Sequence, residues 1–239
     1  NRDSMKFTLA FDVYGTLIDT AGVLHALERM LGEKARPFME AWRSKQLEYT
    51  FRRGLMDKYV DFAVCTEEAL EYCCKLFGAA LTNRQKQSLM EEYTVLPAFP
   101  DAVASLKSLQ ADGHSLFAFS NGSKKAVTSL LGSANLIDYF EGVVSVEDAG
   151  VFKPSPLVYA HFNQVTGSEK SGSWLISGNS FDVVGAVAYG MQAAWVRRAP
   201  QQVFDPWGIE PTTIIHDLNE LPGKLKASGP GTKSRNQKH

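Results

Sequence analysis

Apolar residues occur along the chain in short runs that end abruptly in small polar or charged residues. Short apolar runs bounded in this way are typical of buried strands. Six of them are expected to be strands: Phe7–Phe11, Ser115–Phe119, Gly142–Val146, Ser173–Ile176, Ala193–Val196 and Thr212–Ile215. Helical patterns lie between these runs, at 101–111, 124–131, 156–166 and 182–189. Strands that alternate with helices predict an α/β fold with a parallel sheet, in which ligands bind at the carboxyl ends of the strands.

The stretch from residue 19 to residue 96 has a different pattern, with amphipathic helical periodicity and no run that suggests a strand. It follows the first predicted strand and therefore interrupts the α/β series. We expect an α/β core formed by residues 1–18 and 97–227, with a helical cap subdomain inserted at 19–96. Inserted caps of this kind close a pocket against water. Residues 228–239 contain few apolar side chains and are expected to form a mobile tail.

Composition narrows the class of protein without indicating its chemistry. The chain has 239 residues, 44% of them hydrophobic, and 25 Lys and Arg against 26 Asp and Glu. These values exclude a disordered chain and give no reason to expect a nucleic-acid or membrane partner. The N-terminal residues show no signal-peptide pattern. The cysteines at 65, 73 and 74 have neither a disulfide pattern nor metal-ligand spacing, so we expect a cytoplasmic protein with reduced thiols.

Polar residues stand directly after the first two predicted strands. Asp12 follows the first strand, and a carboxylate there can act as a nucleophile if nearby cations keep it ionised. Gly15 allows a turn that points backbone N–H groups toward the site. Ser120, Asn121 and Gly122 follow the second strand and open a helix, where such groups bind anions. Each motif has an ordinary alternative, a turn-forming aspartate in the first case and a helix cap in the second.

Two later motifs add a cation and more polar groups to the same edge of the sheet. Lys153 precedes Pro154 shortly after the third predicted strand and could neutralise an aspartate or a bound anion. Ser177 and Asn179 follow the fourth strand, and Asp182 lies at the start of the next helix. Taken singly, the lysine could be a solvated surface residue and the aspartate a helix cap.

The order of these motifs is more informative than any one of them. An Asp after the first strand, then Ser-Asn, Lys-Pro and Asn-x-x-Asp resemble the four motifs of the haloacid dehalogenase superfamily. The resemblance extends from Phe11 to about Arg198, and the segment FDVYGTLID is highly specific for that superfamily. It implies a Rossmann-like parallel sheet with an inserted helical cap.

Two departures bear on the branch of the superfamily. Its phosphatases usually carry a second Asp two residues after the nucleophile, which protonates the leaving alkoxide. That position is Tyr14 here, and a halide leaves without protonation. Phosphatases also tend to have an Asp where Asn179 stands, which helps to hold Mg²⁺. With Asp182 as the remaining carboxylate, we expect no metal and no other cofactor.

The finer resemblance is to the L-2-haloacid dehalogenases, also called type II haloacid dehalogenases. Residues 12–17, DVYGTL, are similar to their nucleophile loop, and residues 177–182, SGNSFD, to their fourth motif. Residues 42–50, WRSKQLEYT, look like their cap helix, which carries an arginine that contacts the halide. The cap segment carries the most weight because caps diverge freely across the superfamily.

The arginine in that helix would be Arg43. Arg43, Leu47, Phe51 and Leu55 are spaced by four and therefore share one helical face. A charge on an apolar face needs an anionic partner, although an arginine can also extend to water or pair within the cap. Ser44 departs from the family pattern, which often has Gln there, so pocket shape and substrate range could differ.

The resemblance implies a hydrolytic dehalogenase acting on short L-2-haloalkanoates without a metal. Asp12 would attack C2 opposite the halogen and form an ester, and water would then release a 2-hydroxy acid with C2 inverted. Lys153 would keep Asp12 ionised and bind the substrate carboxylate with Ser120. Catalytic or orienting roles would also fall to Thr16, Arg43, Asn121, Tyr159, Ser177, Asn179 and Asp182. The substrate would contact Tyr14, Arg43, Leu47, Phe62, Ser120, Asn121, Lys153 and Phe181.

Several points stay open in the sequence. Arg43 and Asn121 would receive the halide, whereas Asp182 would either activate water or only pair with Lys153. Tyr14, Leu47 and Phe62 could be plain packing residues. A Mg²⁺-dependent phosphatase of the same superfamily and a non-catalytic binding protein are the alternative functions. A homodimer is an option, but no interface can be located from the chain.

Overall fold

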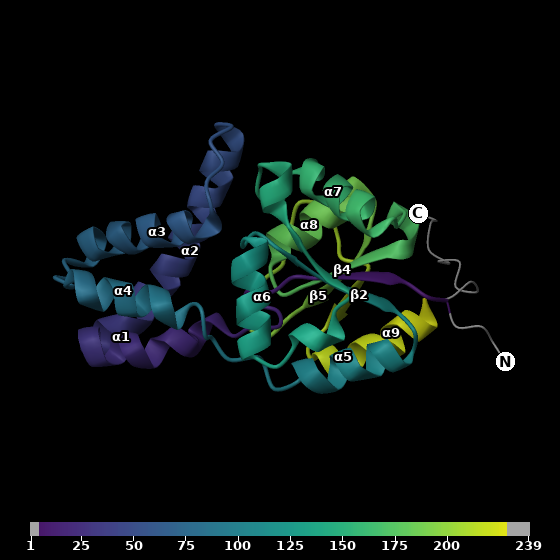
Figure 1. Cartoon of the computed structure of the whole chain (residues 1–239), viewed down its shortest axis with the longest axis horizontal. Coiled ribbons are helices and arrows are strands. Elements are labelled where there is room, and N and C mark those ends of the chain that lie inside the picture. Colours follow the sequence, from purple (N-terminus) through teal and green to yellow (C-terminus); the bar gives the residue numbers. More distant parts are fainter. Residues whose placement is uncertain (1–4, 229–239) are drawn as a thin grey trace.

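The structure is a computed structural model that describes residues 5–228. It contains six parallel strands: β1 (Thr8–Phe11), β2 (Ser115–Ser120), β3 (Gly142–Ser145), β4 (Ser173–Ser177), β5 (Gln192–Val196) and β6 (Thr213–Ile215). They form one sheet in the order β3-β2-β1-β4-β5-β6 (Figure 1). Within this part of the chain every strand pair is parallel, which confirms the predicted α/β class. Because β1 lies between β2 and β4, its carboxyl end is central.

Helices cover both faces of the sheet, as a parallel sheet requires. The core helices are α5 (Ala102–Ala111), α6 (Lys124–Ser133), α7 (Pro156–Thr166), α8 (Ser180–Tyr189) and α9 (Leu221–Ala227). In Figure 1, α7 and α8 pack together above the sheet and α5 and α9 pack together below it. Ser155 caps α7 and Pro156 occupies its first turn, where a missing N–H costs nothing.

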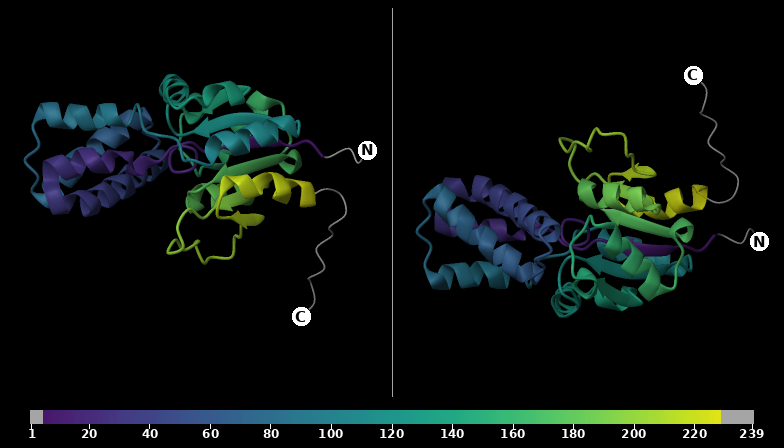
Figure 2. Two further views of the ribbon diagram at one scale, coloured as in Figure 1. Left: turned by 90° about the horizontal axis from the view of Figure 1, so that it is seen from below. Right: turned by 90° about the horizontal axis from the view of Figure 1, so that it is seen from above.

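Four further helices lie together at one end of the molecule in every view (Figures 1 and 2). They are α1 (Leu24–Leu31), α2 (Ala35–Leu55), α3 (Phe62–Phe77) and α4 (Asn83–Glu92). Asp61 caps α3, and Thr82 forms a capping box with Gln85 at the start of α4. Trp42 of α2 is buried against Tyr93, with ring centroids 5.0 Å apart. We propose residues 19–96 as a cap subdomain, with 1–18 and 97–227 as the core.

The chain crosses between these two parts at two neighbouring positions. The N–H of Asp19 donates to the carbonyl of Pro97 at 2.8 Å, and the N–H of Phe99 donates to that of Leu17 at 2.8 Å. Ile18 and Ala98 form an antiparallel bridge between them. The outgoing and returning segments therefore form a paired connection beside the carboxyl end of β1.

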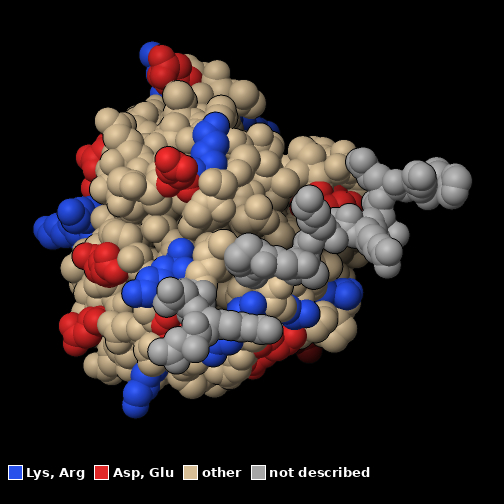
Figure 3. Space-filling view, turned by 90° about the vertical axis from the view of Figure 1, so that its right-hand side faces the viewer, with Lys and Arg blue, Asp and Glu red and all other residues tan. Residues whose placement is uncertain are grey.

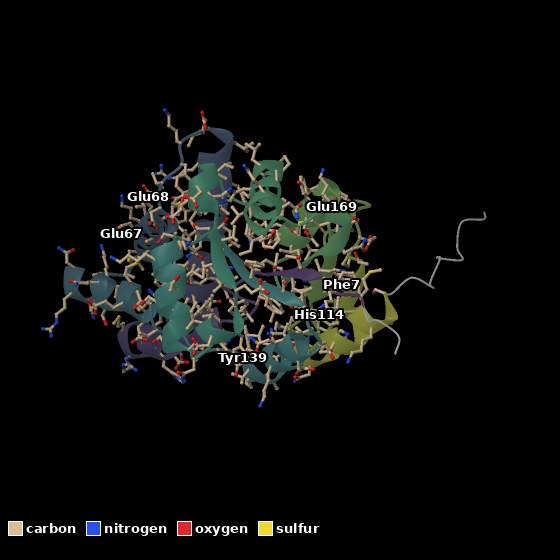
Figure 4. All side chains as sticks on the ribbon, turned by 45° about the vertical axis from the view of Figure 1, so that its right-hand side comes forward. Phe7, Glu67, Glu68, His114, Tyr139 and Glu169 are labelled. Atoms are coloured by element: carbon tan, nitrogen blue, oxygen red, sulfur yellow. The ribbon has the colours of Figure 1, made fainter. Side chains whose placement is uncertain are left out.

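At the end of the sheet away from the cap, stacked aromatic rings and one hydrogen bond hold the starts of β1 and β2 together. Figure 4 shows Phe7 and His114 side by side there, with rings stacked 5.8 Å apart. The N–H of Phe7 donates to Nδ1 of His114 at 3.1 Å. On this end of the molecule, basic and acidic side chains are interspersed (Figure 3). The buried core continues from here along β4, all five residues of which are buried.

Three expectations concern the limits of the chain and its environment. Apart from Ser228, the tail predicted at 228–239 lies outside the described residues. Cys65, Cys73 and Cys74 are buried on α3 without disulfide partners, as expected for reduced thiols on a helix. Between residues 5 and 228, no helix has the length and apolar character needed to cross a membrane.

Candidate active site

The carboxyl ends of three adjacent strands bring the predicted site residues together. Asp12 follows the last residue of β1, while Ser120 and Ser177 are the last residues of β2 and β4. All three are buried, and Asp12 is central because its strand lies between the other two. The N–H of Asp12 donates to the carbonyl of Ile176 at 3.0 Å, which fixes the start of the loop that follows.

The two carboxylate oxygens of Asp12 have different surroundings. Oδ2 accepts hydrogen bonds from the Asn179 amide at 2.6 Å, the Ser177 hydroxyl at 2.8 Å and the Thr16 hydroxyl at 3.0 Å. Oδ1 accepts from the N–H of Val13 at 2.9 Å and from Lys153 Nζ at 3.3 Å. Oδ2 is thus held by three side chains, while Oδ1 is the less restrained oxygen.

Asp12 is held as a carboxylate. Burial alone raises the pKa of Asp12, because an ion loses water on burial. The positive charge of Lys153, the hydrogen bonds from Ser177 and Asn179 and the charge of Arg43 act in the opposite direction and outweigh it. The pKa of Asp12 therefore lies below its ordinary value, as a carboxylate nucleophile requires.

Lys153 is almost fully buried, with 2% of its surface exposed, and all three of its ammonium hydrogens have acceptors. Nζ donates to Asp182 Oδ2 at 2.7 Å, to the Phe119 carbonyl at 2.8 Å and to Asp12 at 3.3 Å. Its backbone N–H donates to Asn121 Oδ1 at 3.0 Å. A lysine bound on this many sides is an internal part of the site rather than a solvated surface residue.

Asp182 forms the second buried carboxylate of the site. Its Oδ1 accepts from the Tyr159 hydroxyl at 2.7 Å, and its Oδ2 accepts from Lys153. Burial and the nearby negative charge of Asp12 raise the pKa of Asp182 to about 6, against the opposing effects of Lys153 and Tyr159. Burial and the charge of Asp182 raise the pKa of Tyr159 well above its ordinary value, so its phenol keeps its proton.

Arg43 reaches the site from α2. Its guanidinium donates to Gln46 Oε1 at 2.7 Å, to Asn179 Oδ1 at 3.3 Å and to the Tyr14 carbonyl at 3.4 Å. Among residues 5–228 it forms no ion pair with a carboxylate, and the three oxygens that accept its hydrogen bonds are all neutral. A guanidinium that has no carboxylate within hydrogen-bond distance is suited to binding an anion.

Ser120 and Asn121 shape the neighbouring loop. The Ser120 hydroxyl oxygen accepts from the N–H of Gly122 at 3.1 Å. Asn121 uses its oxygen to hold the backbone of Lys153, and its amide nitrogen has no acceptor within the described part of the chain. That nitrogen is therefore available as a donor to a bound anion.

The predicted pocket residues divide between two cavities. Tyr14 and Phe62 have ring centroids 5.4 Å apart and line a cavity of about 500 Å³ between cap and core. Phe181 packs edge-on against Phe51 at 5.1 Å and lines a second cavity of about 500 Å³. Leu47 is half-buried and contributes to the lining of neither cavity.

Three neighbours of the site were not singled out by sequence reasoning. Gln46 stands three residues after Arg43, a helical spacing that could have indicated the contact. Arg198 ion-pairs with Asp101 at 2.6 Å and donates to the carbonyl of Thr16, so it supports the loop that carries the nucleophile. Tyr93 lines the same cavity as Tyr14 and Phe62. No local signal marks the last two positions.

The donor set around Asp12 does not fit Mg²⁺, the ion that the phosphatase alternative requires. Asn179 presents its N–H₂ group to Asp12, and a metal ligand would have to present oxygen. Lys153 lies between Asp12 and Asp182 and supplies the positive charge there. Within residues 5–228 no group of three or more His, Cys, Asp or Glu side chains is arranged to hold a metal ion.

Comparison with known proteins agrees with this geometry. The family model of the haloacid dehalogenase-like hydrolases matches residues 8–188. The chain is 36% identical over 213 residues to an (S)-2-haloacid dehalogenase of Pseudomonas putida. The aligned region covers 89% of this chain and 95% of the relative. It is 35% identical over 213 residues to a haloacetate dehalogenase of Moraxella sp. (strain B), covering 89% of this chain and 95% of the relative.

Among solved structures, an L-2-haloacid dehalogenase of Xanthobacter autotrophicus with chloropropionic acid covalently bound superimposes with a TM-score of 0.88. The two chains are 30% identical, and the match covers 94% of this chain and 100% of the other. The agreement therefore extends through both the sheet and the four cap helices. The chain belongs to the haloacid dehalogenase-like hydrolases and, within them, to the family of the L-2-haloacid dehalogenases.

Proposed function

We propose that this protein is a metal-independent hydrolase of carbon–halogen bonds, which converts short L-2-haloalkanoates to 2-hydroxy acids. The observation that carries the proposal is Asp12, a buried carboxylate with a lowered pKa whose Oδ2 is held by three donors while Oδ1 is less restrained. A solved relative with chloropropionic acid covalently bound supports an enzyme-bound intermediate.

In the first step Oδ1 of Asp12 attacks C2 of the substrate from the side opposite the halogen. A C2–O bond forms while the carbon–halogen bond breaks, and the halide leaves with the bonding electron pair. Arg43 and the free amide nitrogen of Asn121 receive the halide beside the apolar ring of Phe181. The Ser120 hydroxyl donates to the substrate carboxylate and the positive charge of Lys153 attracts it, so that C2 is positioned for attack.

In the second step water attacks Cγ of the Asp12 ester. The oxyanion forms on Oδ2 and is stabilised by the donors that already bind this oxygen, namely Thr16, Ser177 and Asn179. One such donor contributes about 3–4 kcal/mol in acyl chemistry. The bond between Cγ and Oδ1 then breaks, and the departing alkoxide takes up the proton that Asp182 removed from the water, so the 2-hydroxy acid leaves with inverted C2. Asp12 is restored as a carboxylate with the water oxygen in place of Oδ1, and the second proton of the water passes to solvent. Asp182, with a pKa of about 6, takes the proton from the attacking water.

The decisive experiment measures halide release from L- and D-2-chloropropionate and from chloroacetate without added metal. The wild type is expected to release chloride from the L-isomer and from chloroacetate, whereas Asp12→Asn is expected to release almost none. Chloride release by Asp12→Asn at the native rate would exclude the covalent mechanism. No release from any of the three acids would refute the proposed function.

Phosphate release from a panel of phosphate monoesters, measured with and without Mg²⁺, separates this proposal from the phosphatase alternative. Tyr14 occupies the position of the phosphatase acid and has its pKa raised to about 12, chiefly by burial, so it does not titrate near neutral pH. A binding protein without catalysis would have no need of a buried, ionised nucleophile.

We further propose that the protein acts in the cytoplasm as a homodimer on a small 2-haloalkanoate. The buried thiols of α3 are consistent with a reducing compartment. Sedimentation velocity at micromolar concentration tests the dimer, and cell fractionation tests the location. A single monomeric species or a secreted protein would refute the respective point.

A further inference from the structure

The second cavity beside the catalytic centre, called here the Trp207 cavity, is not used by the mechanism above. It has a volume of about 500 Å³ and lies between three segments: the last turns of α2, the loop around Lys153, and the loop after β5 that carries Trp207. Its lining includes Phe51, Gly54, Pro154 and Phe181. Cavities of this volume enclose small organic ligands.

The Trp207 cavity adjoins the catalytic centre through two of its lining residues. Lys153 lines it and also donates a hydrogen bond to Asp12. Phe181 lines it and lies in the first turn of α8, between Asn179 and Asp182. A group attached to C2 of a substrate bound at Asp12 is therefore close to this space.

The lining of the Trp207 cavity is almost entirely hydrocarbon. Lys153 is the one charged side chain in it, and its ammonium group is bound to Asp182, Asp12 and the Phe119 carbonyl. Trp207 and Leu55 remain 66% and 91% exposed at its rim. The cavity next to Tyr14 differs, because Asp61, Glu91 and Lys125 line it. An alkyl or aryl group would thus be better accommodated in the Trp207 cavity.

We infer that the Trp207 cavity binds the C2 substituent of the substrate and extends the substrate class to 2-haloacids with medium-length alkyl or aryl substituents. The inference rests on the proposed function, since it assigns a position to one part of that substrate. Each methylene group buried in the cavity is worth up to about fourfold in kcat/KM.

A chain-length series tests the inference. Rates of chloride release would be compared for racemic 2-chloropropionate, 2-chlorobutanoate, 2-chlorohexanoate and 2-chlorooctanoate. We expect kcat/KM to hold or rise from the three-carbon to the eight-carbon acid. A fall of more than about tenfold along the series would overturn the inference, while turnover of 2-chloropropionate would leave the proposed function intact.

Gly54→Leu supplies the matched variant. A Cβ at Gly54 would meet only Val151 Cγ2, at 3.5 Å, and Gly54 lines the cavity, so a leucine there is expected to occupy part of it. We expect the ratio of kcat/KM for 2-chlorooctanoate to that for 2-chloropropionate to fall at least tenfold. The control is Gly132→Leu on α6, where a Cβ would meet nothing within 4 Å and the ratio should not change. An unchanged ratio in Gly54→Leu, or a changed oligomeric state that points to a second copy in the cavity, would contradict the assignment.

Binding of octanoate tests the subsite in the Trp207 cavity separately from the proposed dehalogenase function. Octanoate carries no halogen, and calorimetric titration measures its binding without turnover. We expect it to bind the wild type at least tenfold more tightly than Gly54→Leu. Equal binding of octanoate to the wild type and to Gly54→Leu would contradict the assignment of the Trp207 cavity as a subsite. Selective binding by a protein that releases no halide would refute the proposed function and keep the cavity as a site for acyl chains.

Discussion

Tyr159 donates its phenolic hydrogen to Asp182, with Oη lying 2.7 Å from Oδ1. Both side chains are buried, and the other oxygen of Asp182 lies 2.7 Å from Lys153 Nζ. These two donors stabilise a carboxylate that burial and Asp12 would otherwise hold protonated. The resulting pKa of about 6 places Asp182 where its charge changes within the range of an ordinary assay.

Activity should therefore fall on the acid side of neutral pH. If Asp182 accepts the proton of the hydrolytic water, its protonation below pH 6 removes the base, and kcat should decrease about tenfold for each further pH unit. The measurement is the initial rate of chloride release from pH 4.5 to 8. A kcat that stays constant down to pH 4.5 would assign Asp182 only a pairing role with Lys153.

Protonation of the two site carboxylates does not destabilise the fold in this interval. The folded-state pKa of Asp182 is raised above the ordinary value of 3.8, so the folded state binds this proton more tightly than the unfolded state. Asp182 thus adds stability as the pH falls from about 6 toward 4. Asp12 has the opposite sign, but its stabilising effect is lost only below its ordinary value of 3.8. Circular dichroism at each pH would verify that the fold persists.

Tyr159→Phe should move the acid limb of the rate profile to higher pH. The variant removes a hydrogen bond to a charged carboxylate, worth about 1.5–3 kcal/mol, which corresponds to roughly one to two pKa units. The control is Tyr189→Phe, because the Tyr189 ring stacks on Tyr159 at 6.1 Å and its hydroxyl forms no hydrogen bond to a site residue within residues 5–228. Identical pH profiles for Tyr159→Phe and the wild type would show that the phenol does not control Asp182.

Arg43→Lys should lower kcat/KM about 10- to 100-fold, although it keeps the positive charge. A lysine cannot hold Gln46, Asn179 and the Tyr14 carbonyl and still present a planar donor group to a halide. The loss corresponds to about 1.4–3 kcal/mol, the range for hydrogen bonds of charged groups.

Arg52→Lys is the matched control for Arg43→Lys. Arg52 lies on the same helix, where it pairs with Glu48 on the surface. Its replacement should leave kcat/KM within twofold of the wild type. An equal effect of the two substitutions would mean that the cap helix as a whole, rather than the guanidinium of Arg43, determines the rate.

Gly178→Ala should distort the nucleophile loop. A Cβ at Gly178 would lie 2.5 Å from the Gly15 carbonyl oxygen and 3.4 Å from that of Val196, both of them backbone atoms. Relief requires a backbone shift next to Asp12, at a cost of about 1–3 kcal/mol of stability, with kcat reduced at least tenfold. Thermal denaturation and chloride release measure the two effects.

Gly132→Ala serves as the comparison for Gly178→Ala. Gly132 lies in helix α6, and a Cβ there would meet nothing within 4 Å. Alanine should stabilise this helix by about 0.5–1 kcal/mol without changing the rate. Wild-type stability and rate in Gly178→Ala would mean that the backbone at Gly15 accommodates the methyl group.

The α/β core could be predicted closely because its signals are local. The run expected at Ser115–Phe119 is the strand Ser115–Ser120, and the run expected at Ser173–Ile176 is the strand Ser173–Ser177. Asp12 was identifiable for the same reason, since the carboxyl end of a buried strand marks a ligand site in a parallel sheet. Lys153 needed the family resemblance, because a single lysine gives no local sign that it is buried.

Contacts that depend on the order of the strands could not be predicted. Arg198 and Thr16 are 182 residues apart in the chain. They meet because only one strand, β4, lies between β1 and β5 in the sheet. Leu47 was expected to contact the substrate because it shares a helical face with Arg43. That face was predictable, but the absence of Leu47 from the lining of both cavities was not. Periodicity determines the face of a helix, whereas the position of the helix over the sheet is a property of the assembled molecule.

The paired connection between cap and core has a consequence for how the chain folds. β1 must find β2 across more than a hundred residues, as the pairing of Thr8 with Ser115 shows, and the entropy of closing a loop increases with its length. A cap that folds early brings Ile18 and Ala98 together and so removes most of that loop. The helical insertion, whose contacts are mostly local, then accelerates formation of the central strand pair rather than delaying it.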